Sequence, residues 1–133
     1  EALKNRADAI ATGFVNSLLM GSGQFCTNPG LLIVKEAPEL DTFIGKVAEL
    51  VSAATPSTML TPGIHQAYES GLAKLKANGN VQEIAQAREA GGPNQCRANL
   101  FVTNAQAFLK DGQLSKKEVD EIFNKANKGK GGR

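Results

Sequence analysis

A cysteine set among glycines and small polar residues is the first feature of the sequence that could do chemistry. Residues 21–30 read GSGQFCTNPG and follow an apolar run. Glycine permits backbone conformations that a Cβ would penalise, and small polar residues are poor core material. Such a turn can present Cys26 to a ligand, with its own backbone N–H beside the sulfur to receive an oxyanion. That geometry suits a nucleophile.

Two other interpretations of Cys26 compete with this one. Free cysteine is among the most buried residue types and packs as a small hydrophobe. Cys96 is the second cysteine of the chain, so a disulfide is possible by count. Secreted disulfide scaffolds are smaller and richer in cysteine, so we expect a reducing cytoplasm and Cys96 as a bystander thiol. No histidine or lysine lies next to Cys26, so local chemistry favours nucleophile and structural thiol about equally.

Apolar residues at three- and four-residue spacings predict three main helices around this turn. The first covers residues 2–19. The second opens at Ala37-Pro38 and ends before Thr55. The third has Thr61 as its N-cap and continues to Asn78, which precedes a glycine.

Short apolar runs between the helices predict strands. LLIVK at 31–35 is a continuous apolar run, typical of a buried strand, and NLFVTN at 99–104 is a second. Residues 81–88 fit a strand or a helix, and the glycines that follow favour a strand. Helices that alternate with such runs predict an α/β layered domain with one small sheet.

Composition and charge limit the class of protein. The chain has 133 residues, 41% hydrophobic and 21% charged, which suits one globular domain. Its formal charge of +2 is too small to argue for nucleic acid. The sequence contains no run of about 18 apolar residues, so we expect no membrane span. The charged opening EALKNRADAI does not resemble a signal peptide.

The last segment, residues 115–133, differs from the rest of the chain. Ser115 and Glu118 have the spacing of a capping box and predict a C-terminal helix with a narrow apolar stripe, followed by a disordered end. The segment has six Lys/Arg against three Asp/Glu, so a small basic binding module is an alternative function. No aromatic residue is free to interleave with these lysines, which favours a solvated tail.

Metal ligation is not expected. DGQLSKKE at 111–118 imitates the second half of a calcium-binding EF-hand loop, but Ala107 and Leu109 stand where earlier carboxylates are needed. His65 is the single histidine and suits a surface or capping role better than catalysis.

Several separated strings resemble one known family. LMGSGQFCTNPG resembles the active-site cysteine signature of the aldehyde dehydrogenase superfamily, in which a G-Q/E-x-C core follows a helix. GQFCTNPGLLIV, PSTMLTPGI and NLFVT are similar to the branch of α-ketoglutarate semialdehyde (2,5-dioxovalerate) and NADP-dependent fatty aldehyde dehydrogenases. The resemblance covers residues 1–114 and implies a catalytic-domain fragment followed by an unrelated tail, 115–133.

The resemblance implies a function for the turn. Cys26 would add to an aldehyde or semialdehyde to form a thiohemiacetal, hydride would pass to NAD or NADP, and water would cleave the resulting thioester. The Cys26 backbone N–H would supply part of the oxyanion hole. The active-site loop would also include four neighbours: Gly23, Gln24, Phe25 and Thr27.

The resemblance also implies that much of the parent enzyme is missing. Family members are several times longer, and their cofactor-binding domain, oxyanion-hole asparagine and general-base glutamate lie upstream of the matched stretch. We therefore expect the isolated chain to be inactive, and its natural partner to be the remainder of that enzyme. A half-domain would expose apolar faces, so we also expect self-association, and a non-catalytic interaction fragment is another alternative.

Overall fold

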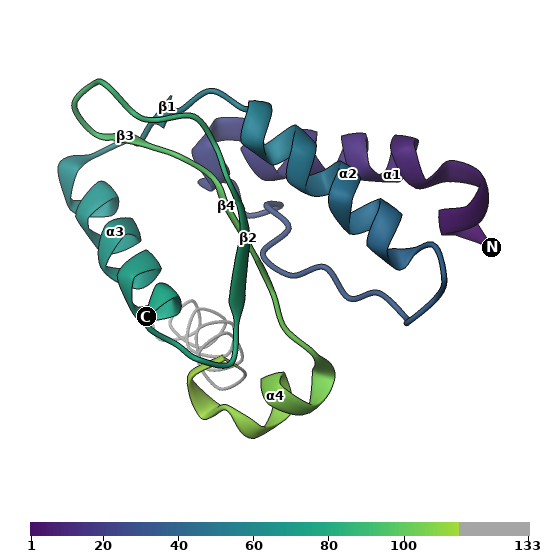
Figure 1. The fold of residues 1–133 in the computed structure, drawn as a ribbon. Helices are drawn as coiled ribbons and strands as arrows, with labels where there is room; N and C mark the ends of the chain where they lie inside the picture. The colour runs from purple at the N-terminus through teal and green to yellow at the C-terminus, as the bar shows by residue number, and fades with distance from the viewer. Residues whose placement is uncertain (115–133) are drawn as a thin grey trace, which may run out of the picture.

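The fold combines helices with short strands. The computed structural model describes residues 1–114. Its elements are in chain order α1 (Ala2–Leu19), the 3₁₀ helix η1 (Met20–Gly23), α2 (Leu40–Ala53), β1 (Ser57–Thr58), α3 (Pro62–Lys76), β2 (Gln82–Gln86), β3 (Gln95–Cys96), β4 (Asn99–Val102) and α4 (Ala105–Lys110). Figure 1 labels the α-helices and the strands.

The strands form two separate antiparallel pairs. β1 pairs with β3, so that Ser57 lies opposite Cys96. β2 pairs with β4, with an irregularity between Glu83 and Ala85. The predicted mixture of helices and strands is confirmed, whereas the strands lie in two small sheets instead of one.

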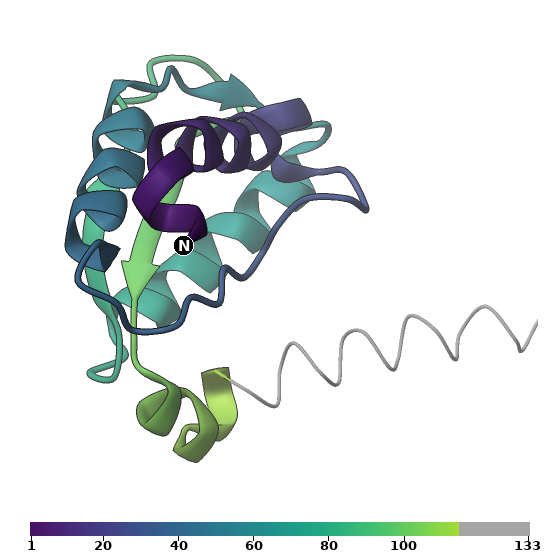
Figure 2. The ribbon, with the colours of Figure 1, turned by 90° about the vertical axis from the view of Figure 1, so that its right-hand side faces the viewer.

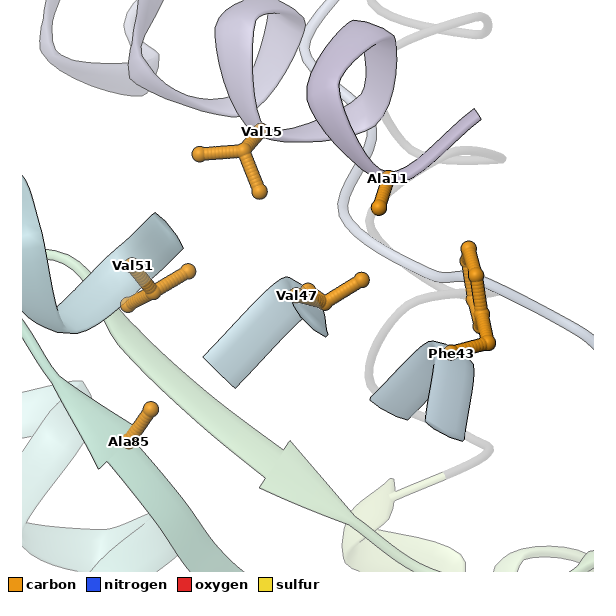
Figure 3. Close-up of a cluster of buried hydrophobic side chains, with 6 residues drawn as sticks. All are labelled: Ala11, Val15, Phe43, Val47, Val51 and Ala85. Carbon is orange, nitrogen blue, oxygen red and sulfur yellow. The ribbon is translucent and has the colours of Figure 1, made fainter. Parts of the chain in front are cut away.

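The core lies between α1, α2 and the β2–β4 pair. The first two helices lie side by side and cover one side of that pair, while α3 lies on its other side (Figures 1 and 2). Phe43 and Val51 of α2 are fully buried. Figure 3 shows the buried cluster, which consists of Ala11, Val15, Phe43, Val47, Val51 and Ala85. No residue of α3 is buried.

The predicted strand at 31–35 is wrong. Residues 24–39 form neither helix nor strand, and the side chain of Ile33 is 91% exposed. A strand needs a neighbour that accepts and donates its backbone hydrogen bonds. None of the strands in residues 1–114 pairs with this run, so its apolar letters alone do not make it a strand.

The predicted helices are confirmed with small shifts at their ends. α1 matches the predicted range, and α2 begins at Leu40 because a turn precedes it. At the start of α3, Thr61 Oγ1 accepts a hydrogen bond from the Ile64 N–H at 3.2 Å, as expected of an N-cap. The strands β2 and β4 lie within their predicted ranges.

One helix was missed. α4 follows Asn104, whose side chain accepts a hydrogen bond from the Ala107 N–H at 2.8 Å. An asparagine before AQAFLK is an N-cap signal that could have identified this helix. The C-terminal helix predicted after Ser115 lies outside the described residues.

Candidate active site

Cys26 lies on an exposed turn that directly follows α1 and η1. Three successive residues before it adopt positive φ: Gly21 at 58°, Ser22 at 58° and Gly23 at 71°. A Cβ on Gly21 would lie 2.4 Å from the ring atom Cε2 of Phe25. The positive φ therefore favours glycine at position 21, and an added Cβ would also require the exposed Phe25 ring to move.

Local hydrogen bonds close this turn against the end of α1. The Gly21 carbonyl accepts from the backbone N–H of Gln24 at 3.1 Å and from its side-chain Nε2 at 2.9 Å. Asn28 donates from Nδ2 to the Leu18 carbonyl at 2.8 Å. Its backbone N–H donates to the carbonyl of Phe25 at 3.1 Å. Cys26 is thus enclosed by a hydrogen-bonded loop although its own side chain is exposed.

Two side chains connect the turn to residues 57–60, a region far away in sequence. Ser22 Oγ lies 2.7 Å from Ser57 Oγ and 3.1 Å from the Thr58 carbonyl oxygen. Gln24 Oε1 accepts a hydrogen bond from the Leu60 N–H at 2.8 Å. The structure therefore brings together two of the strings that carried the family resemblance, GQFC and PSTML.

The two cysteines have opposite surroundings. Both are free thiols, and Cys26 is exposed, which removes the interpretations as a disulfide half and as a buried structural thiol. Cys96 is 6% exposed. Burial raises the pKa of the Cys96 thiol, the negative charge of Glu69 adds to this effect, and a hydrogen bond with the Ser57 side chain opposes it.

The other predicted loop residues accompany Cys26 at the surface. Gly23, Gln24 and Thr27 are exposed, and the ring of Phe25 is 56% exposed. Within residues 1–114, neither the sulfur nor the backbone N–H of Cys26 makes a hydrogen bond. The Cys26 N–H therefore has no hydrogen-bond partner among the described residues.

His65, for which the sequence favoured a surface or capping role, lies on α3 and contacts the β3 segment. Its Nε2 lies 3.0 Å from the Gln95 carbonyl oxygen and 3.8 Å from a carboxylate oxygen of Glu69. One turn later, Tyr68 donates to the Arg97 carbonyl at 2.6 Å, and burial raises the pKa of its phenol. These contacts fasten α3 to the β3–β4 segment.

Sequence reasoning missed Ser22, Asn28 and residues 57–60 as parts of the site. Ser22 carried a usable signal, because a small polar residue between two glycines can adopt positive φ. The long-range contacts to residues 57–60 had no local signal.

The strands of the described residues do not form a dinucleotide site of the Rossmann type. Both sheets are antiparallel, whereas dinucleotide sites of the Rossmann type lie on parallel strands with a glycine-rich turn into a helix. Residues 1–114 also hold no group of three His, Cys, Asp or Glu side chains suited to a metal ion. None of their helices has the length and apolar character to cross a membrane.

An open cavity of about 1370 Å³ is lined by residues on both sides of the Cys26 turn, among them Leu18 and Pro29, but not by Cys26 itself. Apolar residues from the inner faces of the helices and the β2–β4 pair line it, among them Phe14, Leu18, Ile44, Leu72, Leu75 and Leu100. Leu31 and Leu32 of the incorrectly predicted strand line it as well. Cys26 is not one of its lining residues, so the cavity is not a pocket around the thiol.

Two curated relatives align with nearly the whole chain, and both are aldehyde dehydrogenases by name. One is alpha-ketoglutaric semialdehyde dehydrogenase 2 of Azospirillum brasilense, 42% identical over 126 residues, or 95% of this chain. The other is alpha-ketoglutaric semialdehyde dehydrogenase of Acinetobacter baylyi, 31% identical over 119 residues, or 90% of this chain. The predicted resemblance to the aldehyde dehydrogenase superfamily is thereby confirmed.

The similarity concerns part of each relative. The chain spans 23% of the length of each. An alignment of 126 residues exceeds the 114 residues of the predicted resemblance, so it continues past residue 114. The division of the chain at that residue stays a prediction. No family model matches the chain.

Proposed function

We propose that this chain contributes the nucleophile of an NAD(P)-dependent aldehyde dehydrogenase, and that Cys26 is that nucleophile. The observation that carries the proposal is the exposed thiol on a turn closed by hydrogen bonds, with a free backbone N–H at the same residue. The 42% identity to a semialdehyde dehydrogenase supports it. Gly23, Gln24, Phe25 and Thr27 form the loop around the thiol.

The chemistry that these residues support is addition to a carbonyl. The sulfur of Cys26 attacks the carbonyl carbon of an aldehyde, a C–S bond forms, and the C=O π electrons move to the oxygen. The Cys26 N–H stabilises the developing oxyanion, which takes up the proton that the thiol has lost to solvent. The product is a thiohemiacetal. One such N–H donor is typically worth about 3–4 kcal/mol in the transition state.

Oxidation to the acid requires groups that the described residues do not hold. The thiohemiacetal must lose a hydride to a nicotinamide, and the resulting thioester must then be hydrolysed by a positioned base. We propose that both groups belong to the remainder of a longer enzyme, because the relatives are about four times as long as the matched part. The isolated chain should therefore show no turnover.

We propose a semialdehyde as the substrate class, on the printed names of the two relatives. We further propose a reducing compartment, such as the cytoplasm, because both thiols are free.

A direct test separates adduct formation from turnover. The chain is mixed with a short semialdehyde carrying ¹³C at its carbonyl carbon, and the thiohemiacetal carbon is observed by NMR. We expect a signal from wild type and Cys96→Ala and none from Cys26→Ala. In parallel, NAD or NADP is added and the absorbance of the reduced cofactor is followed. Adduct formation that persists in Cys26→Ala would contradict the proposal, and turnover that depends on Cys26 would contradict the predicted inactivity.

A second candidate function is a non-catalytic interaction fragment. It is favoured by the apolar cavity and by the exposed side chains of Ile33, Leu60 and Leu109. A partner that binds Cys26→Ala as tightly as wild type would support this alternative. The third candidate, a basic binding module in 115–133, concerns residues that lie outside the described part of the chain.

A further inference from the structure

The side chain of Gln24 joins the Cys26 turn to a distant segment through two hydrogen bonds. Its Nε2 donates to the Gly21 carbonyl at 2.9 Å, and its Oε1 accepts from the Leu60 N–H at 2.8 Å. Gln24 lies two residues before Cys26 and 36 residues before Leu60. One amide group thus fixes both the shape of the turn and its position.

Residues 57–60, which receive this contact, are fixed by hydrogen bonds to the segment around β3. Ser57 and Thr58 form β1, which pairs with β3. The Met59 N–H donates to the Asn94 carbonyl at 2.9 Å, and the Met59 side chain is buried. Residues 57–60 are therefore a fixed point against which a loop can be positioned.

The contact between the Cys26 turn and Leu60 is a hydrogen bond and does not involve apolar packing of the Leu60 side chain. The Leu60 side chain is 82% exposed, so the contact depends on the hydrogen bond to Gln24. Ser22 makes the neighbouring connection through its hydroxyl, with Ser57 and Thr58 as partners. It does so from a positive φ of 58°, which is uncommon for a residue other than glycine.

We propose that Gln24 is a positioning residue for Cys26. Its amide holds the turn against residues 57–60, so that the thiol and the backbone N–H of Cys26 have one arrangement when an aldehyde arrives. Placing a reacting group in advance lowers the entropy lost in the reaction. This inference rests on the proposed role of Cys26 as a nucleophile.

The experiment compares Gln24→Ala with Gln24→Glu, since glutamate keeps the acceptor for Leu60 but has no N–H for Gly21. Gln66→Ala is the matched control, because Gln66 is an exposed glutamine on α3. Amide hydrogen exchange at Leu60 reports the contact itself, with the Met59 amide as internal reference. We expect exchange at Leu60 to be about tenfold faster in Gln24→Ala and close to wild type in Gln24→Glu and Gln66→Ala.

The second measurement is the fraction of Cys26 present as the ¹³C thiohemiacetal at a fixed semialdehyde concentration. We expect a several-fold loss in Gln24→Ala and a partial recovery in Gln24→Glu, which keeps the contact to Leu60 but loses the one to Gly21. The thermal unfolding midpoint should be the same in all three variants. Unchanged Leu60 exchange in Gln24→Ala, or an unchanged adduct fraction with faster Leu60 exchange, would overturn the positioning role.

The two proposals fail in different ways. Absence of an adduct in the wild-type chain would overturn the nucleophile assignment, and the positioning role with it. An adduct that forms equally well in wild type and Gln24→Ala would overturn the positioning role alone. If Gln24→Ala does not fold, Ser22→Gly takes its place, because it removes the neighbouring contact and suits the positive φ.

Discussion

Cys26 and Cys96 carry the same thiol in opposite surroundings, so their reactivities should differ. Cys26 is exposed on its turn, whereas Cys96 is buried with a raised pKa. A raised thiol pKa leaves less thiolate at a given pH, and the thiolate is the nucleophile. With limiting iodoacetamide at neutral pH, we expect mass spectrometry to find Cys26 modified several-fold faster than Cys96.

The control for this measurement is the chain in denaturant, where burial no longer separates the two thiols. The rates of labelling should then converge. Faster labelling of Cys96 in the folded chain would contradict both the burial argument and the nucleophile assignment.

Asp111 should give the chain a measurable acid sensitivity. The side chains of Asn78 and Asn80 donate to its carboxylate at 2.8 and 2.9 Å and hold its pKa below the ordinary value. A depressed carboxyl pKa contributes stability above the unfolded-state value of about 3.9, and this contribution is lost as pH falls through the folded-state value. Asp111→Asn should therefore flatten the dependence of the unfolding free energy on pH below about 4.

Asp8→Asn is the comparison for Asp111→Asn, since Asp8 is an exposed carboxylate on α1. It should leave the acid dependence as in wild type. An identical acid dependence in Asp111→Asn and wild type would mean that the asparagine contacts do not stabilise the fold.

At the scale of elements, the turn before Cys26 should be intolerant of a methyl group. Gly21→Ala places a Cβ at a positive φ and within 2.4 Å of the Phe25 ring. The left-handed conformation alone costs roughly 1–2 kcal/mol for an ordinary residue. We expect a loss of unfolding free energy of at least that size in urea titrations.

Gly13→Ala provides a matched control within α1. Apart from its chain neighbours and the backbone of its own helix, no heavy atom lies within 4 Å of the added Cβ. Alanine should stabilise the helix there by about 0.5–1 kcal/mol. A loss of stability in both variants would show that the effect at Gly21 is not specific to the turn.

The elements also show which parts of the fold a sequence can predict. α1, α2 and α3 were predicted because their periodicity and caps are local, and the Thr61 cap is present as expected. LLIVK was misassigned because a strand depends on a partner elsewhere in the fold. The same distinction applies to the candidate site. The turn at Cys26 could be predicted because it depends on neighbouring residues. The contacts of Ser22 and Gln24 with residues 57–60 could not, because they link positions 35 or more residues apart.

Several large apolar side chains of the described residues are exposed to solvent. The cavity of about 1370 Å³ is lined mostly by apolar residues, and Ile33 and Leu109 are 91% and 75% exposed. Exposed apolar surface favours association. We expect sedimentation to show an average mass that rises with protein concentration.

A double variant, Ile33→Lys with Leu109→Lys, should reduce this association because it places charge on two of the exposed sites. The exposed Ser52→Lys on α2 is a control that adds charge elsewhere. A wild-type chain that stays monomeric at high concentration would contradict the argument from exposed apolar surface.

The long coil between η1 and α2 is a site at which the chain can be cut. Residues 31–36 are mostly exposed and lie in no helix or strand, so a protease can cut there. The piece with α1 would remain bound, because Ala11 and Val15 pack in the same cluster as Phe43, and because Gln24 holds Leu60. The protein should therefore reassemble from two peptides, and the smaller peptide, which contains Cys26, can be made synthetically with selenocysteine or an isotope label at that one position.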